Sequence, residues 1–257
     1  MTNSSNLIDS LEIYTLSNPN DVKPHWVSHF IVPTANELLI KIKNKDGNSG
    51  FGLATSYTDI TPLIKPFSNG LSDLIIGEDP FCPEKIYQKI FKLTDARISN
   101  EKGWSKEAII RISAALDIAC WDLIGKSSNI PLYKLFGGFR NKVPVYVTCG
   151  YYREGKSETE LKEELNKLIE IGHQSFKVKV GGLTIKEDAK RLEIIRDVIG
   201  EEKDLMIDVN RAWDLKTAIE GVMEFKKFKP TWIEEPLRWE DDRRTLRLLS
   251  KQTDIPI

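Results

Sequence analysis

The sequence lacks several features that would define its class at once. No apolar run in its 257 residues approaches the roughly 20 residues that a membrane-spanning helix needs. Residues 1–6 are polar and lack the basic and apolar segments of a secretory signal. Charge of one sign is not in excess, since 37 basic residues stand against 38 acidic ones and the net charge is −1. We therefore expect neither a membrane nor a nucleic-acid partner.

Cysteine is scarce as well. The three cysteines, Cys82, Cys120 and Cys149, are far apart, and no Cys-x-x-Cys pair or Cys/His cluster indicates a zinc site or a disulfide framework. Reduced thiols in the cytoplasm are the simplest interpretation. No Gly-x-Gly-x-x-Gly follows any strand-like run, and no Gly-x-x-x-x-Gly-Lys-Ser/Thr loop occurs. This excludes the usual dinucleotide and P-loop sites.

The sequence divides into two regions, and the first combines strand-like and helix-like patterns. Over residues 7–16 and 36–43, apolar and polar residues alternate as they do in strands. Turn-forming residues at 46–48 lead into a return strand, so a small antiparallel sheet is expected. Helical patterns follow, the clearest over residues 105–124. The first region, residues 1–140, is therefore predicted to be an α+β domain.

In the second region, residues 141–257, strand-like and helix-like segments alternate with a period near thirty residues. Parallel strands joined by crossover helices produce this order. A barrel and an open doubly wound sheet both satisfy it. A (β/α)8 barrel typically takes around 250 residues, so this region suffices for about half of one, with residues 254–257 as the entry into a fifth strand. The strand-like runs are 143–149, 175–180, 204–209 and 231–235, and the helix-like runs are 158–171, 185–199 and 214–228.

Two lysines interrupt the apolar pattern of the run at 175–180. Residues two apart on a strand point the same way, so Lys177 and Lys179 share the face opposite three apolar residues. A solvated lysine face on an edge strand is the ordinary interpretation. Among crossover helices, however, a strand is covered on both sides, and two buried ammonium groups need anions beside them. Crowding by a second cation also lowers the pKa of a lysine, which makes it a usable base near neutral pH.

The next two strand-like runs end in oxygen-bearing side chains. Asp208 and Asn210 share one face at the end of 204–209, and Glu234 lies at the end of 231–235. Taken alone, Asp208 and Asn210 could cap a turn, and Glu234 could lie on a charged loop. Three consecutive strands with such ends argue against coincidence, because barrel enzymes place catalytic groups at this end of their strands. A lysine base beside oxygen ligands for a hard divalent cation is a coherent chemical set.

Together these motifs resemble the mandelate racemase/muconate lactonizing enzyme-like subgroup of the enolase superfamily. The resemblance rests on Lys-x-Lys, Asp-x-Asn and Glu-Glu-Pro on consecutive strands, and on the segments 113–126 and 130–138, which are similar to the family's signature before the barrel. It runs from about residue 7 to residue 257. It implies that residues 1–140 form an α+β capping domain and residues 141–257 the first half of a (β/α)7β TIM-type barrel, truncated.

The resemblance also implies roles for individual residues. Lys179 would remove the proton α to a substrate carboxylate, and Lys177 would lie beside that carboxylate and tune Lys179. Asp208 and Glu234 would be two of three Mg²⁺ ligands, and Asn210 would lie near the metal or the substrate. The divalent cation would stabilise the dianionic intermediate as it forms.

Weaker candidates come from the loops of the capping domain, which close over the site in this family. Tyr57 is a candidate for substrate binding, and His25 with Trp26 are others. His29 and His173 are interpreted as structural or surface residues.

The activity itself stays open at this point. We expect a magnesium-dependent lyase that dehydrates a sugar acid, with a racemase or epimerase of a 2-hydroxy acid as the alternative. A third hypothesis is a catalytically incomplete fragment, because the third acidic ligand and the second acid/base would follow Ile257. The expected partner is a small-molecule carboxylate, and the full-length protein is expected to be a cytoplasmic homo-oligomer.

Overall fold

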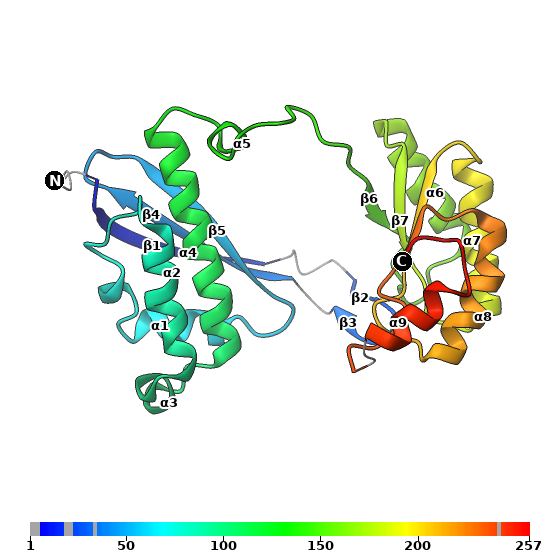
Figure 1. Cartoon of the computed structure of the whole chain (residues 1–257), viewed down its shortest axis with the longest axis horizontal. Coiled ribbons are helices and arrows are strands. Elements are labelled where there is room, and N and C mark those ends of the chain that lie inside the picture. Colours follow the sequence, from blue (N-terminus) through cyan, green and yellow to red (C-terminus); the bar gives the residue numbers. More distant parts are fainter. Residues whose placement is uncertain (1–5, 18–22, 33–34, 241–242) are drawn as a thin grey trace. The chain divides into compact units, whose positions relative to one another are not determined.

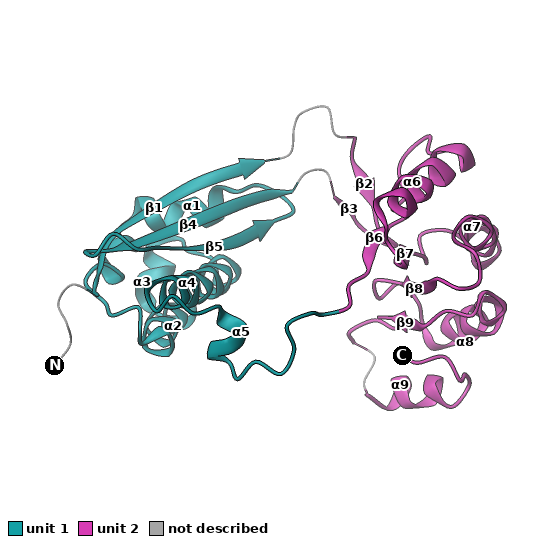
Figure 2. Cartoon of the chain, turned by 90° about the horizontal axis from the view of Figure 1, so that it is seen from above, with its two compact units in different colours: residues 1–22, 34–143 teal, residues 23–33, 144–257 magenta. Residues whose placement is uncertain are grey.

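The chain forms two compact units, which carry different colours in Figure 2. The computed structural model describes residues 6–17, 23–32, 35–240 and 243–257. Unit 1 contains Met1–Val22 and Thr34–Val143, and unit 2 contains Lys23–Pro33 and Pro144–Ile257. The division after Val143 lies close to the boundary expected after residue 140.

Unit 1 is an antiparallel sheet packed against helices (Figure 1). The strand order is β1-β4-β5, so the predicted strands and the return strand are present. The strands are β1 (Ile8–Ser17), β4 (Asn36–Asn44) and β5 (Ser49–Ser56). The helices are α1 (Thr61–Ser68), α2 (Pro83–Phe91), α3 (Arg97–Lys102), α4 (Lys106–Ser127) and α5 (Leu132–Leu135), with 3-10 turns at Ser72–Leu74 and Lys92–Asp95. The predicted helix over 105–124 is thus α4.

The length of α4 follows from its sequence. Ser105 caps its N-terminus by accepting a hydrogen bond from the Ala108 amide at 3.2 Å. Apolar residues at helical spacing then bury one side of the helix against the sheet, where Leu38, Ile40 and Ile42 are fully buried. This contact forms the core of unit 1.

Two glycines of β5 allow α4 to lie directly on the strand. A Cβ atom added at Gly50 would stand 1.9 Å from the carbonyl oxygen of Ala119, and one added at Gly52 would stand 1.9 Å from that of Ala115. The space between helix and strand therefore holds no side chain at these positions.

Unit 2 contains a parallel sheet with the strand order β6-β7-β8-β9. The strands are β6 (Val147–Cys149), β7 (Ser175–Lys179), β8 (Asp204–Asp208) and β9 (Trp232–Glu234). The helices are α6 (Glu158–Ile171), α7 (Ile185–Ile199), α8 (Leu215–Phe225) and α9 (Arg243–Ser250), with a 3-10 turn at Lys226–Phe228. Each strand lies beside its predecessor, and Figure 2 shows α6, α7 and α8 on one face of the sheet. A doubly wound sheet would reverse its strand order and carry helices on both faces, so the barrel-type arrangement is confirmed, without closure.

Local signals define the helices of unit 2. Complete capping boxes start α6 at Ser157 and α7 at Thr184, and Asp214 caps α8. The helices bury their apolar sides against Phe176, Val178 and the other outward residues of the strands. The last residues of the chain lie beside β9, since the Ile233 amide donates to the Pro256 carbonyl at 2.9 Å. This is where the sequence predicted a fifth strand to begin.

One segment differs from the predicted division. The short strands β2 (His25–Trp26) and β3 (Ile31–Val32) pair with each other and belong to unit 2. Trp26 forms an antiparallel bridge with Tyr152, with N–O distances of 2.9 and 3.2 Å, and the two rings stack at 6.1 Å. Because this pairing joins residues far apart in the sequence, a local pattern could not reveal it.

Two further features bear on the sequence-based expectations. Among the helices of the described residues, none combines the length and apolar character needed to cross a bilayer. The three cysteines are free, with Cys82 exposed and Cys120 and Cys149 buried.

The glycine contact between β5 and α4 yields a first prediction. Gly52→Ala should lower the free energy of unfolding by about 3 kcal/mol, because the new methyl group must displace the α4 main chain. Urea unfolding measures the change. Leu53→Ala is the matched control: this neighbour is 42% exposed on the opposite face of β5, and its loss should cost within about 0.5 kcal/mol. Equal losses for the two variants would contradict the close packing.

Candidate active site

The last residues of three neighbouring strands form one row across the sheet of unit 2. Lys179 ends β7, Asp208 ends β8 and Glu234 ends β9. In the parallel register, Lys179 lies opposite Asp208, and Asp208 lies opposite Glu234. Residues opposite one another in a sheet point to the same face, so the three side chains stand together. The sequence predicted this grouping from the alternation within each strand.

A compact cluster of ion pairs follows from this register. Lys179 Nζ stands 2.7 Å from Asp208 Oδ2. Lys177 Nζ lies 2.9 and 3.0 Å from the two carboxylate oxygens of Glu234, and 3.4 Å from Asp208 Oδ2. Lys177, Lys179 and Asp208 are 8, 6 and 2% exposed. The two ammonium groups are therefore buried with anions beside them, and a solvated lysine face is excluded.

The pKa of Lys177 is determined by its two carboxylate neighbours. Burial lowers its pKa, but the hydrogen bond that Lys177 donates to Glu234 and the charges of Asp208 and Glu234 outweigh burial, so the pKa is raised above its ordinary value. The lowered pKa expected from crowding by a second cation concerned the lysine that acts as the base, and it stays a prediction.

The turn after β8 places Asn210 at the edge of the cluster. Its amide donates to Asp208 Oδ1 at 3.0 Å, and its carbonyl accepts from the Ser28 hydroxyl at 3.4 Å. The carboxamide oxygen of Asn210 is buried and has no hydrogen-bond partner in the described part of the chain. A buried acceptor without a donor is costly, so this oxygen is a candidate ligand contact.

Backbone strain accompanies this turn. Asn210, Arg211 and Glu235 have φ angles of +49°, +67° and +44°, and the Arg211 amide donates to the Glu235 carbonyl at 2.7 Å. Left-handed residues other than glycine are uncommon and gather at functional sites. Only Asn210 is of a residue type that favours this conformation, so the conformations of Arg211 and Glu235 could not be predicted from their residue types.

Two tyrosines near the ends of β6 complete the surroundings of the lysines. Lys177 Nζ lies 5.3 Å from the centre of the Tyr146 ring, and Lys179 Nζ lies 5.4 Å from that of Tyr151. The Tyr151 ring also contacts His25, with ring centres 4.7 Å apart. Burial and the positive charges of Lys156 and Lys179 lower the pKa of His25. Neither tyrosine was predicted from the sequence, because aromatic residues beside a strand are ordinary core residues.

The remaining candidates have weaker structural support. Tyr57 belongs to unit 1, follows β5 and is 51% exposed, and its role in substrate binding stays a prediction. His29 is exposed, with Nδ1 3.0 Å from the Ser28 hydroxyl. His173 lies in the turn between α6 and β7, with its amide bonded to the Leu168 carbonyl at 3.1 Å.

The cluster fits part of a magnesium site. Mg²⁺ prefers hard oxygen ligands, which Asp208 and Glu234 supply from adjacent strands, and each carboxylate already stands beside positive charge. Within the described residues, no group of three or more His, Cys, Asp or Glu side chains could hold a metal ion. Asp208 and Glu234 are therefore the acidic side chains of this cluster that could contribute to a metal site.

A cavity of about 520 Å³ lies elsewhere in unit 2. Its lining includes Trp26, Tyr152 and Leu161, but none of Lys179, Asp208 and Glu234. The four strands β6 to β9 form an open sheet that does not close around the row of charged residues.

Comparisons with known proteins agree with this geometry. The mandelate racemase/muconate lactonizing enzyme N-terminal domain matches residues 10–137, and the enolase C-terminal domain-like family matches residues 160–257. The chain belongs to the mandelate racemase/muconate lactonizing enzyme family of the enolase superfamily. The resemblance stated from the motifs is thus confirmed.

The relatives of this family member carry out more than one reaction. L-talarate/galactarate dehydratase of Salmonella typhimurium is 34% identical, over 78% of this chain and 48% of the relative. Arabinonate dehydratase of Saccharolobus solfataricus is 31% identical, over 84% and 56%. L-Ala-D/L-Glu epimerase of Clostridium acetobutylicum is 32% identical, over 91% and 63%. The chain thus spans about half to two thirds of the length of these relatives.

Solved structures show the same fold. L-talarate/galactarate dehydratase from Salmonella typhimurium, liganded with Mg and L-lyxarohydroxamate, has a TM-score of 0.82 at 28% identity, covering 98% of this chain and 63% of that one. A racemase from Streptomyces coelicolor with bound magnesium has a TM-score of 0.82 at 27% identity, covering 97% and 68%. The predicted α+β region followed by parallel β/α units is therefore confirmed.

The ion-pair cluster yields a second prediction. Asp208→Ala should lower the free energy of unfolding by about 3–5 kcal/mol, because the Lys179 ammonium stays buried without its nearest carboxylate. Chemical denaturation measures the change. Asp254→Ala removes a carboxylate from an exposed pair with Lys226 at 2.8 Å, and it should cost at most about 1 kcal/mol. A loss for Asp208→Ala no larger than that of the control would show that Lys179 is not held in a buried pair.

Proposed function

We propose that the chain carries the base and part of the metal site of an enzyme that removes a proton α to a carboxylate. The observation that supports this most directly is the row of Lys179, Asp208 and Glu234 at the ends of adjacent parallel strands. A base and two oxygen ligands then stand within one substrate's reach, which is the arrangement that this reaction needs.

Each residue takes a separate part in the proposed reaction. Lys179 Nζ, as an uncharged amine, would accept the α-proton. Lys177 Nζ lies beside the carboxylates of Asp208 and Glu234, and it would donate a hydrogen bond to the substrate carboxylate. Asp208 and Glu234 would hold Mg²⁺, which supplies electrostatic stabilisation of the negative charge that develops on that carboxylate.

Dehydration of a sugar acid is the reaction that we favour. The unpartnered carboxamide oxygen of Asn210 would accept a hydrogen bond from a substrate hydroxyl, which a polyhydroxy acid offers. The proton that Lys179 has taken up would then pass to the hydroxyl on the β-carbon, which leaves as water, and the resulting enol tautomerises to a 2-keto acid. The two dehydratases among the relatives support this choice.

Racemisation or epimerisation is the second candidate. The L-Ala-D/L-Glu epimerase at 32% identity and the structure of a racemase support it. It uses the same base on one face of the α-carbon and requires a second acid/base on the other face.

We also propose that residues 1–257 alone do not turn over substrate. In the described residues only two acidic side chains meet at the site, and two ligands bind Mg²⁺ weakly. The greater length of the relatives supports this proposal. The cytoplasmic location, the homo-oligomeric state and the part of Tyr57 stay predictions.

The proposed base yields a third prediction, for the protein encoded by the complete open reading frame. With Mg²⁺ and a library of sugar acids in D₂O, Lys179→Ala should reduce α-proton exchange by about 10³-fold or more, because it removes the base. NMR measures the exchange, and a 2-keto-acid assay measures elimination. Lys167→Ala on the exposed side of α6 is the control and should leave the rate unchanged.

The outcomes separate the candidate functions. Keto-acid formation supports dehydration, whereas exchange without elimination supports racemisation or epimerisation. Unchanged exchange in Lys179→Ala would overturn the assignment of the base. Removing Mg²⁺ with EDTA should abolish the exchange, and exchange that persists would exclude the metal role of Asp208 and Glu234.

The fragment proposal yields a fourth prediction. Purified residues 1–257 should show no α-proton exchange above the uncatalysed rate under the same conditions, because they supply an incomplete ligand set. The same NMR assay measures this. Turnover by these residues would refute the proposal directly.

A further inference from the structure

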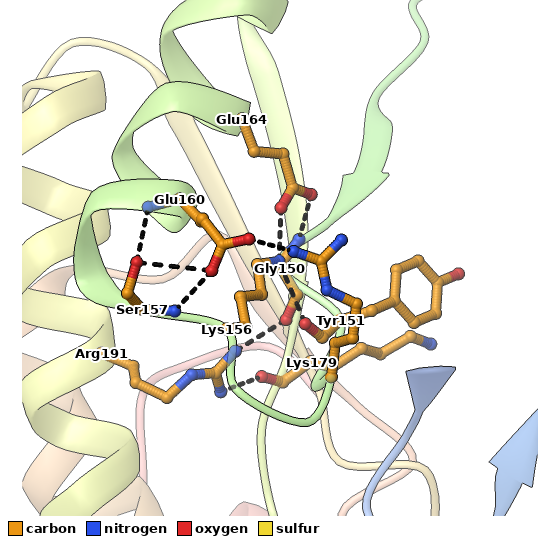
Figure 3. A network of polar contacts seen from close by, with 9 residues as sticks. Gly150, Tyr151, Lys156, Ser157, Glu160, Glu164, Lys179 and Arg191 are labelled. Carbon is orange, nitrogen blue, oxygen red and sulfur yellow. Dashed lines mark hydrogen bonds and ion pairs between the residues drawn. The ribbon is translucent and has the colours of Figure 1, made fainter. Parts of the chain in front are cut away.

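A second ion pair stands on the helix-facing side of the sheet and holds the main chain on which Lys179 is mounted. Arg191 of α7 donates from Nη1 to the carbonyl oxygen of Lys179 at 3.0 Å and from Nη2 to that of Gly150 at 2.7 Å (Figure 3). Nη1 also donates to Asp188 Oδ1 at 2.9 Å. One guanidinium group therefore joins the end of β7 to the residue that follows β6.

Asp188 holds the main chain that follows Lys179, as Arg191 holds the Lys179 carbonyl. Its Oδ2 accepts a hydrogen bond from the Gly181 amide at 2.7 Å, and its Oδ1 accepts one from the Tyr152 hydroxyl at 2.6 Å. The Tyr152 hydroxyl accepts in turn from the Gly182 amide at 3.1 Å. Asp188 is 1% exposed. The main chain is thus fixed on both sides of Val180, immediately after Lys179.

A further ion pair positions the neighbouring aromatic ring. Lys156 and Glu164 form an ion pair, in which Lys156 Nζ also donates to the Tyr151 carbonyl at 3.1 Å and Glu164 Oε1 accepts from the Gly150 amide at 2.9 Å (Figure 3). The main chain around Tyr151 is therefore held from both sides. The ring of Tyr151 is the one that lies 5.4 Å from Lys179 Nζ.

We propose that the Asp188–Arg191 pair is a positioning device for Lys179, a role that rests on the proposed function of Lys179 as the base. A lysine at the end of a strand takes its place from its main chain, and small displacements of a reacting group cost much of the rate. Arg191 satisfies two strand-end carbonyls at once with the rigid fork of its guanidinium group, which is more pre-organised than the flexible ammonium group of a lysine. The side-chain hydrogen bonds of Asp188 and Arg191 go to Tyr152, Gly181, Gly150 and Lys179 rather than to Lys177, Asp208 or Glu234, so the pair acts through the backbone.

The same helix provides a matched control. Arg196 of α7 is also buried, and its guanidinium donates to the carbonyl oxygens of Gly200, Lys203 and Phe228 at 2.8 to 3.2 Å. These carbonyls precede β8 and β9, at the opposite ends of the strands from Lys179. Removing Arg196 therefore deletes the same kind of interaction at a place that does not hold the base.

The first arm of the test needs no activity. Amide hydrogen exchange of the 257-residue chain, followed by NMR, should show Gly181 and Gly182 exchanging about tenfold faster in Arg191→Ala than in the unmodified chain. Arg196→Ala should leave both amides within about twofold of the unmodified rate once global stability is matched with denaturant. Tyr152→Phe, which keeps the ring and removes the hydroxyl, should likewise accelerate amide exchange of Gly182. This variant replaces Arg191→Ala in the test if Arg191→Ala does not fold.

The second arm measures the reaction of the protein encoded by the complete open reading frame. Arg191→Ala should lower kcat for α-proton exchange by about 10- to 100-fold with KM changed less than about threefold, and Arg191→Lys should recover part of the loss. Arg196→Ala should leave kcat unchanged. Unaltered exchange of Gly181 and Gly182 in Arg191→Ala and Tyr152→Phe, or an equal fall of kcat in Arg196→Ala, would overturn the positioning role. If the unmodified protein exchanges no α-proton at all, the proposed function fails, and the amide measurement still decides whether the pair holds this chain segment.

Discussion

Two ammonium groups are buried at the carboxyl ends of parallel strands, and the rest of the site depends on balancing their charge. Lys177 and Lys179 can stay charged out of solvent only where carboxylates meet them, and Asp208 and Glu234 do so from the next two strands. The in-register pairing of the strand ends brings the four groups together. A shift of one residue in any of these strands would point a charge at the apolar helix side, so the register and the site are specified by the same pattern.

This dependence explains how much the sequence could predict. Alternation within each strand decides which side chains share a face, so the grouping of Lys179, Asp208 and Glu234 followed from local pattern. The pKa direction of Lys177 did not follow, because it depends on distances to two carboxylates on other strands rather than on the adjacent lysine. The same limit applies to Tyr151, whose ring meets Lys179 only after β6 and β7 have paired.

The β2–β3 hairpin shows the limit at the level of the fold. Its residues lie between strands of unit 1 in the sequence, and a local pattern assigns them there. Trp26 forms main-chain hydrogen bonds and a ring stack with Tyr152 of unit 2 instead, and His25 lies against Tyr151. Strand pairing between distant segments is decided by non-local contacts, so a sequence pattern gives the elements of each unit but not the unit to which a short hairpin belongs.

The ion pair of Asp188 and Arg191 lies where carbonyl groups at the ends of two parallel strands need hydrogen-bond donors. Where a parallel strand ends, its last carbonyl loses the partner that the ladder provided, and an unpaired buried carbonyl is costly. An apolar side chain at position 191 would fill the space and leave the carbonyls of Gly150 and Lys179 without their guanidinium donor. A buried ion pair adds little stability over a good apolar contact, but it fixes the direction of the chain at the strand end. The Asp188–Arg191 pair on the helix side therefore holds the charged cluster on the other face of the sheet. The main chain of Lys179 links the two.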